Sequence, residues 1–438
     1  MFMLGCLHTA VAEAKVWTLQ ECIDHALANN INLRQKNIST LQSSEDVKQS
    51  RAALFPSVSF STNHNMSYHP FSESTVNLTD GAMTSNTNKV SYNGSYGINA
   101  NWLVWNGNKN RMAVKQNRMR MMQSMLDEEI FANSIQEQIV QLYVQVLYEA
   151  EAVRVNEEIV KASQAKADRA KEMVEVGSLA RVDWVQLDAQ VAQDTYSLVN
   201  AQSQLERFRL ELKQLLELHL DEDFEVIDPE IGEEKVMAVV PDKKEVYETA
   251  LKNRPEIQAS MLDITSAELS IKSARTGYMP TLSLTAGIGT NNSSGQNIGF
   301  ATQIKNHLLS SLGLTLSVPI FDNLQTRTEI RKAKYAKMNS ELNMEDQEDE
   351  IYSTVERYWL DATTAQQQYI YAKKNRESMA ESYSLVSEQF NCGLKNIIEL
   401  TTGKNNLLMA EQQLLQAKYT ALLNRALLRF YAGEKMEL

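Results

Sequence analysis

Residues 96–104 read YGINANWLV, a run in which apolar and polar side chains alternate. Successive side chains of a β-strand point to opposite faces, whereas a helix would spread the same residues around its axis. The run therefore predicts a strand with one apolar face. That face carries Tyr96, Ile98, Ala100, Trp102 and Val104, and the other face carries Gly97, Asn99 and Asn101.

Three other segments alternate in the same way, so strands are predicted at about 57–68, 95–105, 281–289 and 311–321. Each is roughly as long as a tilted strand that crosses a bilayer. Alternation alone also fits any half-buried antiparallel sheet. Four strands, however, close no useful barrel, and an open sheet leaves backbone groups that lipid cannot satisfy. Symmetric association of three chains would close a twelve-stranded barrel.

An internal repeat organises the whole chain. ALAN at 26–29 corresponds to ALKN at 250–253, an offset of 224. Beyond the polar loop that follows Pro280 the offset is 216, which carries Gly177 onto Gly393. We therefore predict two copies of one unit, repeat one at 17–218 and repeat two at 242–434, with residues 219–241 as the segment that joins them.

Each copy also contains two long helical segments. Residues 109–176 contain no Pro or Gly, and as one helix they would extend on the order of 100 Å. Apolar residues at three- and four-residue spacing in the following segment predict coiled-coil-like packing. The helices are expected at 109–176, 179–218, 323–391 and 396–432. Helices alone would fit an ordinary helical bundle equally well.

Composition excludes several classes of function. The 438 residues contain 43 Lys and Arg against 55 Asp and Glu, a net charge of −12, which argues against a nucleic-acid partner. No internal apolar run has the 18 or so residues that a membrane helix needs. The three cysteines and six histidines form no metal motif, and no nucleophile–base or phosphate-binding pattern occurs. We therefore predict neither an enzyme nor a cofactor or metal site.

The first 14 residues, MFMLGCLHTAVAEA, are typical of the end of a secretory signal peptide. A short apolar stretch is followed by small residues that suit signal cleavage. No Lys or Arg precedes this stretch, so the true start codon is left open. In an alternative interpretation Cys6 is a lipidated N-terminus, because MLGC at 3–6 is a loose lipobox.

Aromatic and basic residues gather at the ends of the predicted strands that lie next to the long helices. The aromatic residues fit an interfacial girdle of a membrane barrel, and the loops at the other ends, 69–89 and 290–306, are polar. The basic residues fit a collar that contacts lipid phosphates, or equally a solvated helix face. The aromatic set is Trp102, Trp105 and Phe321; the collar is Arg111, Lys115, Arg118, Arg327, Arg331 and Lys334.

The order and spacing of several segments resemble the TolC family of outer-membrane efflux proteins, over essentially the whole mature sequence. The segments are LQECIDHAL at 19–27, Phe55-Pro56 and Met279-Pro280 before the strands, VGSLARVD at 176–183 and NCGLKNIIE at 391–399. The resemblance implies an α+β membrane protein of a Gram-negative outer membrane. Its fold would be a trimeric twelve-stranded β-barrel continued by a long antiparallel α-helical periplasmic barrel.

The same resemblance implies a passive exit duct in a tripartite efflux or type I secretion system. Its partners would be two further copies of the chain, a periplasmic adaptor protein, outer-membrane lipid and an inner-membrane pump of the RND, ABC or MFS type. Residues 219–241 would contribute to an equatorial collar. The cargo, the type of pump and the open or closed resting state are left open.

The turns at the ends of the long helices are the predicted periplasmic gate. Glu399 matches a position where relatives place an acid in the lumen, and Lys395 matches a basic residue that helps to latch the closed tip. Thr402 stands where the family has a second acid, which puts the strength of the acidic ring in doubt. In an alternative interpretation these charges only cap helices. The gate residues are Gly177, Arg181, Asp183, Gly393, Lys395 and Glu399.

Two other interpretations fit parts of the sequence. A soluble periplasmic coiled-coil scaffold or adaptor would pack its apolar strand faces on protein and would be extracted without detergent. A cluster of methionines between Met112 and Met125 carries sulfur that suits Cu(I), although methionines on a long helix more often fill gaps in a core.

Overall fold

The computed structural model describes residues 15–71, 75–79, 82–86, 89–219, 224–227, 232–294 and 298–438. Two compact units are present, and each is described by itself. The helical unit comprises residues up to Ile38, Met125–Ser260 and Asn343–Leu438, and the strand unit comprises Ser39–Ser124 and Met261–Leu342. The predicted signal peptide, with Cys6, lies outside the described residues.

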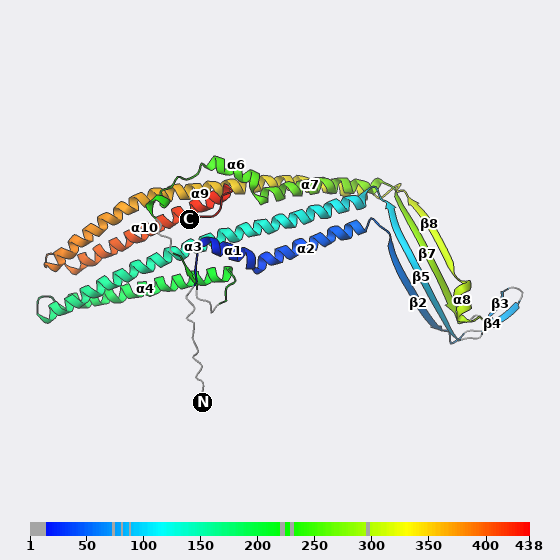
Figure 1. Cartoon of the computed structure of the whole chain (residues 1–438), viewed down its shortest axis with the longest axis horizontal. Helices are drawn as coiled ribbons and strands as arrows, with labels where there is room; N and C mark the ends of the chain where they lie inside the picture. Colours follow the sequence, from blue (N-terminus) through cyan, green and yellow to red (C-terminus); the bar gives the residue numbers. More distant parts are fainter. Residues whose placement is uncertain are drawn as a thin grey trace, which may run out of the picture. The chain divides into compact units, whose positions relative to one another are not determined.

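The strand unit contains a four-stranded antiparallel sheet in the order β2–β5–β7–β8, whose strands run side by side in Figure 1. Its strands are β2 (Ser57–Tyr68), β5 (Val90–Trp105), β7 (Thr281–Ser293) and β8 (Leu309–Ser317). Pairing between β5 and β7 joins the hairpins of the two repeats. In the described chain β2 and β8 each have a neighbour on one side only, so they are the edges of the sheet.

One face of this sheet is apolar and exposed. Phe60, Leu312 and Leu314 expose 67%, 77% and 67% of their surface, values that belong to no packed core. Ala100, Ala286 and Leu312 share a row across three strands, so the alternation in each strand falls in register. The result is one continuous apolar surface.

A β-bulge lengthens that surface at one end of β5. Trp102 pairs with Leu284 and Leu103 with Ser283, but the next pair along is Trp105 with Leu282. One residue of β5 is therefore unpaired, and the side chain of Trp105 moves to the face that Trp102 already occupies. Without the bulge, Trp105 would point to the polar face.

Several strand boundaries differ from those predicted: β7 continues to Ser293 and β8 begins at Leu309, and two further differences have clear causes. β5 begins at Val90, before the expected start near residue 95, because its polar outer part still pairs with β2. β8 ends at Ser317 and not at 321, since Pro319 has no backbone N–H for a ladder hydrogen bond. The predicted polar loops also contain structure: strands β3 (Thr75–Thr79) and β4 (Ala82–Asn86), and helix α8 (Phe300–Asn306).

Parts of four helical segments complete the strand unit. They are α2 (Ile31–Ala52), α7 (Pro255–Arg275) with the short η1 (Thr276–Tyr278), and the first parts of α3 (Lys109–Glu175) and α9 (Gln325–Asn391). The unit includes α2 from Ser39 and α7 from Met261. Asn117 on α3 donates to Asp46 of α2, and Gln116 donates to Ser270 of α7. Since Lys337 of α9 pairs with Glu268 of α7 at 3.0 Å, the helices follow the order of the strands.

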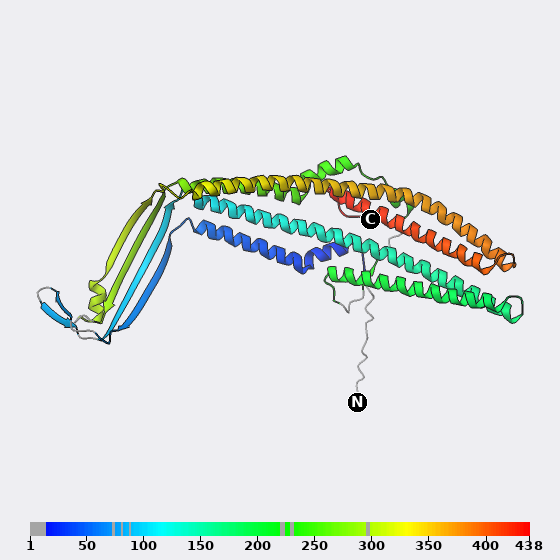
Figure 2. The same cartoon turned by 180° about the vertical axis from the view of Figure 1, so that it is seen from behind.

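The helical unit is built from two antiparallel pairs, α3 with α4 (Arg181–Leu215) and α9 with α10 (Ile397–Tyr431). Figures 1 and 2 agree that each pair runs side by side to a tight turn. A large apolar cluster includes Ile139, Leu212, Leu422 and Leu427, so both repeats contribute to one core.

Shorter elements pack at the middle of this unit. They are β1 (Lys15–Trp17), α1 (Leu19–Asn29), β6 (Phe224–Val226), α5 (Glu233–Val236) and α6 (Lys243–Asn253). β1 pairs in parallel with β6, which fastens the start of repeat one to the segment between the repeats. Thr18 and Glu21 form a capping box that starts α1.

The turn from β5 into α3 requires a glycine. Gly107 has a φ of +67°, and a Cβ there would lie 2.7 Å from the Cβ of Met279. We predict that Gly107→Ala costs about 2–4 kcal/mol of unfolding free energy through backbone strain and overlap. Gly177 is the matched control, because its φ is +74° and nothing lies within 4 Å of the added carbon. Thermal unfolding in detergent should therefore show a clearly larger loss for Gly107→Ala, and equal losses would contradict the overlap.

Candidate functional site

The turns that end the long helices have the same geometry in both repeats. Gly177 and Gly393 have φ angles of +74° and +75°, which side chains disfavour. Gly177 N donates to Val174 O, and Ser178 N donates to Met173 O at 2.8 Å. This pattern closes a helix through a left-handed glycine, and the second turn repeats it. The glycines therefore set the shape of both tips.

Lys395 and Glu399 meet at the tip of repeat two. Lys395 Nζ donates to Glu399 Oε1, and Asn396 forms a capping box with Glu399 at the start of α10. The hydrogen bond from Lys395, followed by that from the Asn396 backbone, holds the pKa of the Glu399 carboxyl below its ordinary value. Glu399 is therefore a carboxylate at neutral pH. Both side chains are substantially exposed.

The tip of repeat one is arranged differently. Arg181 begins α4 and Asp183 lies in its first turn, where a negative charge favours the helix dipole. No ion pair in the described part of the chain includes Arg181 or Asp183. Of the four predicted gate charges, the structure therefore brings together only Lys395 and Glu399.

A buried ion pair, which sequence reasoning missed, links the two repeats farther from the turns. Lys404 Nζ on α10 lies 2.5 and 2.6 Å from the two carboxylate oxygens of Asp194 on α4. The side chains are only 8% and 6% exposed, and Gln190 also donates to Asp194. Because the partners are far apart in the sequence, no local pattern predicts this contact.

A second polar contact links the other two helices at this site. Lys166 Nζ of α3 donates to the Tyr383 hydroxyl of α9 at 2.5 Å and lies 4.2 Å from the centre of its ring. Burial, and then the charge of Lys404, lower the pKa of Lys166 to about 8. Leu187 and Leu400 belong to the apolar cluster around these groups. Polar contacts thus join α4 with α10 and α3 with α9, so each links one repeat to the other.

The predicted girdle residues lie at one end of the apolar sheet face. Trp102 Nε1 donates to Leu54 O at 2.9 Å. The bulge turns the side chain of Trp105 to the same face of the sheet as that of Trp102. Phe321 follows β8 in the turn and is 76% exposed.

Aromatic residues also lie at the opposite end of the same face, where sequence reasoning placed Tyr96 on the face but missed Tyr92 and its contact with His64. There the His64 Nδ1 atom lies 2.6 Å from the Tyr92 hydroxyl, and the His64 ring meets that of Tyr96 edge to face. Tyr92 was within reach of the alternation pattern, which continues past the predicted strand start.

The six predicted collar residues form one exposed stripe in each repeat. On α3 they have the spacing i, i+4, i+7, and on α9 the spacing is identical. Asn117 and Gln116, which contact the neighbouring helices, lie on the opposite side of α3. No ion pair in the described chain includes a collar residue, whereas nearby Lys337 binds Glu268 and Glu341. The stripes are Arg111, Lys115 and Arg118, and Arg327, Arg331 and Lys334.

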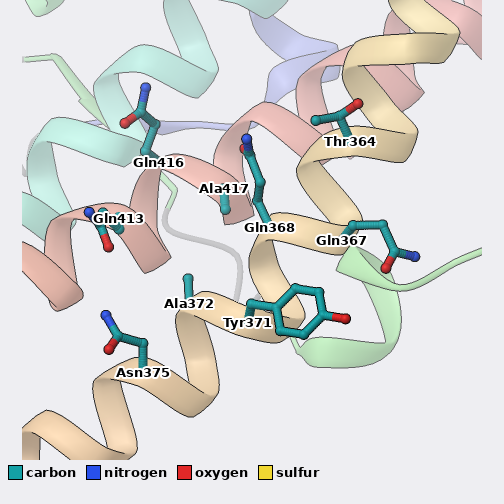
Figure 3. Close-up of a pocket in the computed structure, with 9 residues that line it drawn as sticks. All are labelled: Thr364, Gln367, Gln368, Tyr371, Ala372, Asn375, Gln413, Gln416 and Ala417. Carbon is teal, nitrogen blue, oxygen red and sulfur yellow. The ribbon is translucent and has the colours of Figure 1, made fainter.

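A polar groove of about 610 Å³ lies between α9 and α10. Figure 3 shows amide side chains from both helices around it, with the ring of Tyr371 on the α9 side. Gln367 and Asn375 belong to α9, and Gln413 and Gln416 to α10; no charged side chain lines the groove. Such a surface suits contact with a polar partner more than catalysis.

Within the described residues, no helix has an apolar stretch long enough to cross a bilayer. The same residues contain no group of three or more His, Cys, Asp or Glu side chains placed to hold a metal ion.

Comparisons with known proteins point to one family. The model of the family described as outer membrane efflux protein matches residues 22–217 and 246–434. Toxin and drug export protein A of Aggregatibacter actinomycetemcomitans is 22% identical over 408 residues, which cover 92% of this chain and 83% of that protein.

Solved structures show the same fold. The crystal structure of CusC matches with a TM-score of 0.80 at 15% identity and covers 97% of this chain and 96% of its own. The CmeC outer membrane channel of Campylobacter jejuni matches with a TM-score of 0.78 at 19% identity, over 96% and 87%. The predicted TolC-like fold, with long helices, strands and a tandem repeat, is confirmed.

The buried ion pair leads to a stability prediction. Lys404→Met leaves the Asp194 carboxylate buried without its cation and should cost about 3–5 kcal/mol of unfolding free energy. Adding Asp194→Leu removes the stranded charge and should recover most of the loss. Chemical unfolding of both single variants and the double variant in detergent measures this coupling. Losses that simply add would contradict it.

Lys166 gives a prediction for pH dependence. Its pKa is about 8 in the folded chain against 10.5 in a model peptide, so between these values the unfolded chain binds more protons. Stability from this group therefore rises as pH increases from about 8 to 10.5. The difference in thermal midpoint between the parent and Lys166→Met should shift in favour of the parent over this window. A constant difference would mean that Lys166 titrates normally.

Proposed function

The chain belongs to the outer membrane efflux protein family, and on this premise we propose that three copies form one passive exit duct. Members of this family are outer-membrane efflux channels with a periplasmic extension, and this chain is therefore a channel and not an enzyme. Channels of this class serve tripartite efflux and type I secretion systems. The observation that carries the proposal is an exposed apolar sheet face that ends in two unpaired strand edges.

The edges explain why one copy is insufficient. In hydrocarbon each unsatisfied backbone N–H or C=O costs several kcal/mol, and β2 and β8 each present a row of them. If β8 of one copy pairs with β2 of the next, the ring closes without an edge. Three copies then supply the twelve strands of the proposed barrel.

The height of the apolar face supports its placement in a bilayer. Tyr96 and Trp105 lie on this face at its two ends, because the bulge turns Trp105 toward it. Their partners on β7 are Thr290 and Leu282, eight residues apart, so at about 3.3 Å per residue they are roughly 26 Å apart along the strand. A tilt of about 40° reduces this distance to roughly 20 Å along the membrane normal, comparable with the apolar band of such barrels, which is about 25 Å tall.

The basic stripes fit a contact with lipid phosphate. They begin beside the sheet, carry no partner acid in the described chain, and occupy the side of α3 that contacts neither α2 nor α7. We propose Trp102, Trp105 and Phe321 as the interfacial girdle and the two stripes as the collar beside it. Attraction to phosphate would be worth about 1 kcal/mol per cation.

The tip is proposed as the gate, and its partners as a periplasmic adaptor and an inner-membrane pump of the RND, ABC or MFS type. Asp183 and Glu399 would bring six carboxylates to the threefold axis, which favours cations. Lys395 and Arg181 would partly neutralise this ring. Export of toxins or drugs would suit the name of the relative from Aggregatibacter.

The gate assignment is tested by conductance. Purified protein reconstituted in planar bilayers should form channels, and Lys395→Ala with Arg181→Ala should raise the single-channel conductance because contacts that narrow the tip are lost. Lys244→Ala with Lys252→Ala removes the same charge from exposed positions on α6 and should leave conductance unchanged. Equal conductance in all three proteins would reject these gate residues, while a protein that forms no channel and leaves plain buffer as a monomer would reject the duct.

A further inference from the structure

A small pocket lies where β5 turns into α3, at the end of the sheet that adjoins the helices (Figure 1). Its volume is about 170 Å³, below the roughly 300 Å³ at which pockets for drug-sized ligands begin. It therefore suits one small polar group and not a whole cargo molecule. We call it the junction pocket. Its polar lining consists of indoles, amides and a guanidinium: Trp102, Trp105, Asn106, Asn108, Asn110 and Arg111.

The protein itself holds two walls of the junction pocket in place. Trp102 Nε1 donates to Leu54 O at 2.9 Å, which fixes this indole beside the end of α2. Asn106 Nδ2 donates to Asn110 Oδ1 at 2.8 Å, and Asn106 Oδ1 accepts from the Asn110 backbone at 3.3 Å. These contacts need no ligand, so the pocket is formed before one binds.

Two donors of the junction pocket are unused within the described residues. Neither the Arg111 guanidinium nor the Trp105 indole N–H has a hydrogen bond or ion pair there. A guanidinium binds phosphate oxygens through two parallel hydrogen bonds, and an indole N–H at a membrane interface seeks a polar partner. The sequence from 90 to 126 contains no Asp or Glu, so no acid of this segment competes for Arg111. The complement of these donors is an anion with several oxygens, and phosphate meets that description.

The pocket also has an apolar wall. Leu103 and Val104 line it and expose 40% and 41% of their surface, and Trp105 exposes 42%. A free phosphate ion would leave these side chains uncovered, whereas the glycerol and acyl chains of a lipid would cover them. The combination of polar and apolar lining therefore favours a lipid phosphate over an inorganic one.

The equivalent turn of repeat two has the same backbone conformation. Gly107 and Asn108 have φ angles of +67° and +70°, and their equivalents Asn323 and Leu324 have +52° and +66°. Differences between the two turns therefore lie in their side chains.

Those side chains remove the pocket's chemistry from repeat two. Val318 replaces Trp102, Phe321 replaces Trp105, and Asp322 replaces Asn106. Asp322 Oδ2 accepts from the Thr326 backbone at 2.9 Å, so a carboxylate that repels phosphate is built into the turn. The guanidinium alone is retained, as Arg327, which provides a matched control for Arg111.

We infer that the junction pocket binds the phosphate of one glycerophospholipid per chain, in the membrane leaflet nearest the helices. Arg111 supplies the charge and a fork of donors, Trp105 supplies a further donor, and the acyl chains lie along the apolar sheet face. This inference rests on the proposed placement of that face in a bilayer. It goes beyond the collar because it assigns a discrete site to one repeat, whereas the collar attracts lipid along both stripes.

Lipid titration of the purified protein in a mild detergent tests the site. Dioleoyl-phosphatidylglycerol should saturate at one tightly held lipid per chain when bound lipid is counted by native mass spectrometry. Arg111→Gln should weaken this binding about tenfold, because a charge-assisted hydrogen-bond pair is lost. Arg327→Gln removes the same charge from repeat two and should leave the binding unchanged. Equal losses in the two variants would mean diffuse attraction by the collar and would overturn the discrete site.

Exchanging the amide and the acid between the two turns tests the assigned lining. Asn106→Asp introduces the acid that the same turn carries in repeat two, so the turn should still form, and repulsion should weaken lipid binding about tenfold. A thermal midpoint close to that of the parent verifies the fold. Asp322→Asn should add no second lipid, because its turn lacks both indoles. Unchanged binding in the first variant, or a second lipid in the other, would overturn the lining.

Two competing ligands identify the part of the lipid that binds. Dioleoylglycerol has the acyl chains without the phosphate and should not displace the bound lipid, while inorganic phosphate should displace it far more weakly than a second phospholipid does. Displacement by either at the concentration of the phospholipid itself would overturn the inference.

The proposed duct is tested separately by its channels. A protein that forms channels in planar bilayers but holds no lipid at the junction pocket overturns this inference and leaves the duct intact. A protein without channels rejects the duct, whatever its lipid count.

Discussion

The structure depends on one constraint, that a backbone exposed to hydrocarbon must find its hydrogen bonds within protein. The sheet meets this condition between β2 and β5, β5 and β7, and β7 and β8, and fails it at the two outer edges. The long helices show the same incompleteness in another form, because α10 is covered on both flanks while α4 and α9 each have a bare one. Both the sheet and the helical pairs thus present surfaces that this chain alone leaves without a neighbour.

Duplication explains how so long a chain builds these elements. Each repeat supplies one hairpin of strands and one pair of helices, and the same offset relates the helix ends. The repeats have nevertheless diverged where they touch. Asp194 and Lys404 are joined within the chain, but the equivalents of these residues are Ala410 and Asp188, which cannot form the same pair. Within the described residues, the contact of Asp194 with Lys404 therefore has no counterpart at the equivalent positions of the other repeat.

Much of this architecture could be predicted from local patterns, and the failures have physical causes. Alternation predicts strands because the sheet face is uncovered, and the absence of Pro and Gly predicts the long helices. The ends of β5 and β8 were wrong because polar residues continue one ladder and Pro319 stops the other. At the tip, Lys395 and Glu399 stand four residues apart, a spacing that sequence reveals. The contact of Asp194 with Lys404 depends on how two distant helices pack, and no spacing encodes it.

The energies of these contacts decide where the resistance to opening lies. The pair of Lys395 and Glu399 is exposed, and pairs of this kind contribute about 0–1 kcal/mol, too little to hold a tip shut alone. The pair of Asp194 and Lys404 is buried and costs far more to break, but it joins helices of the same chain. This buried pair therefore holds the helical pair of repeat one to the helical pair of repeat two. It does not resist movement of one copy against another. In the proposed trimer, resistance to opening would therefore have to come from contacts between copies, to which the exposed charges of three tips would contribute together.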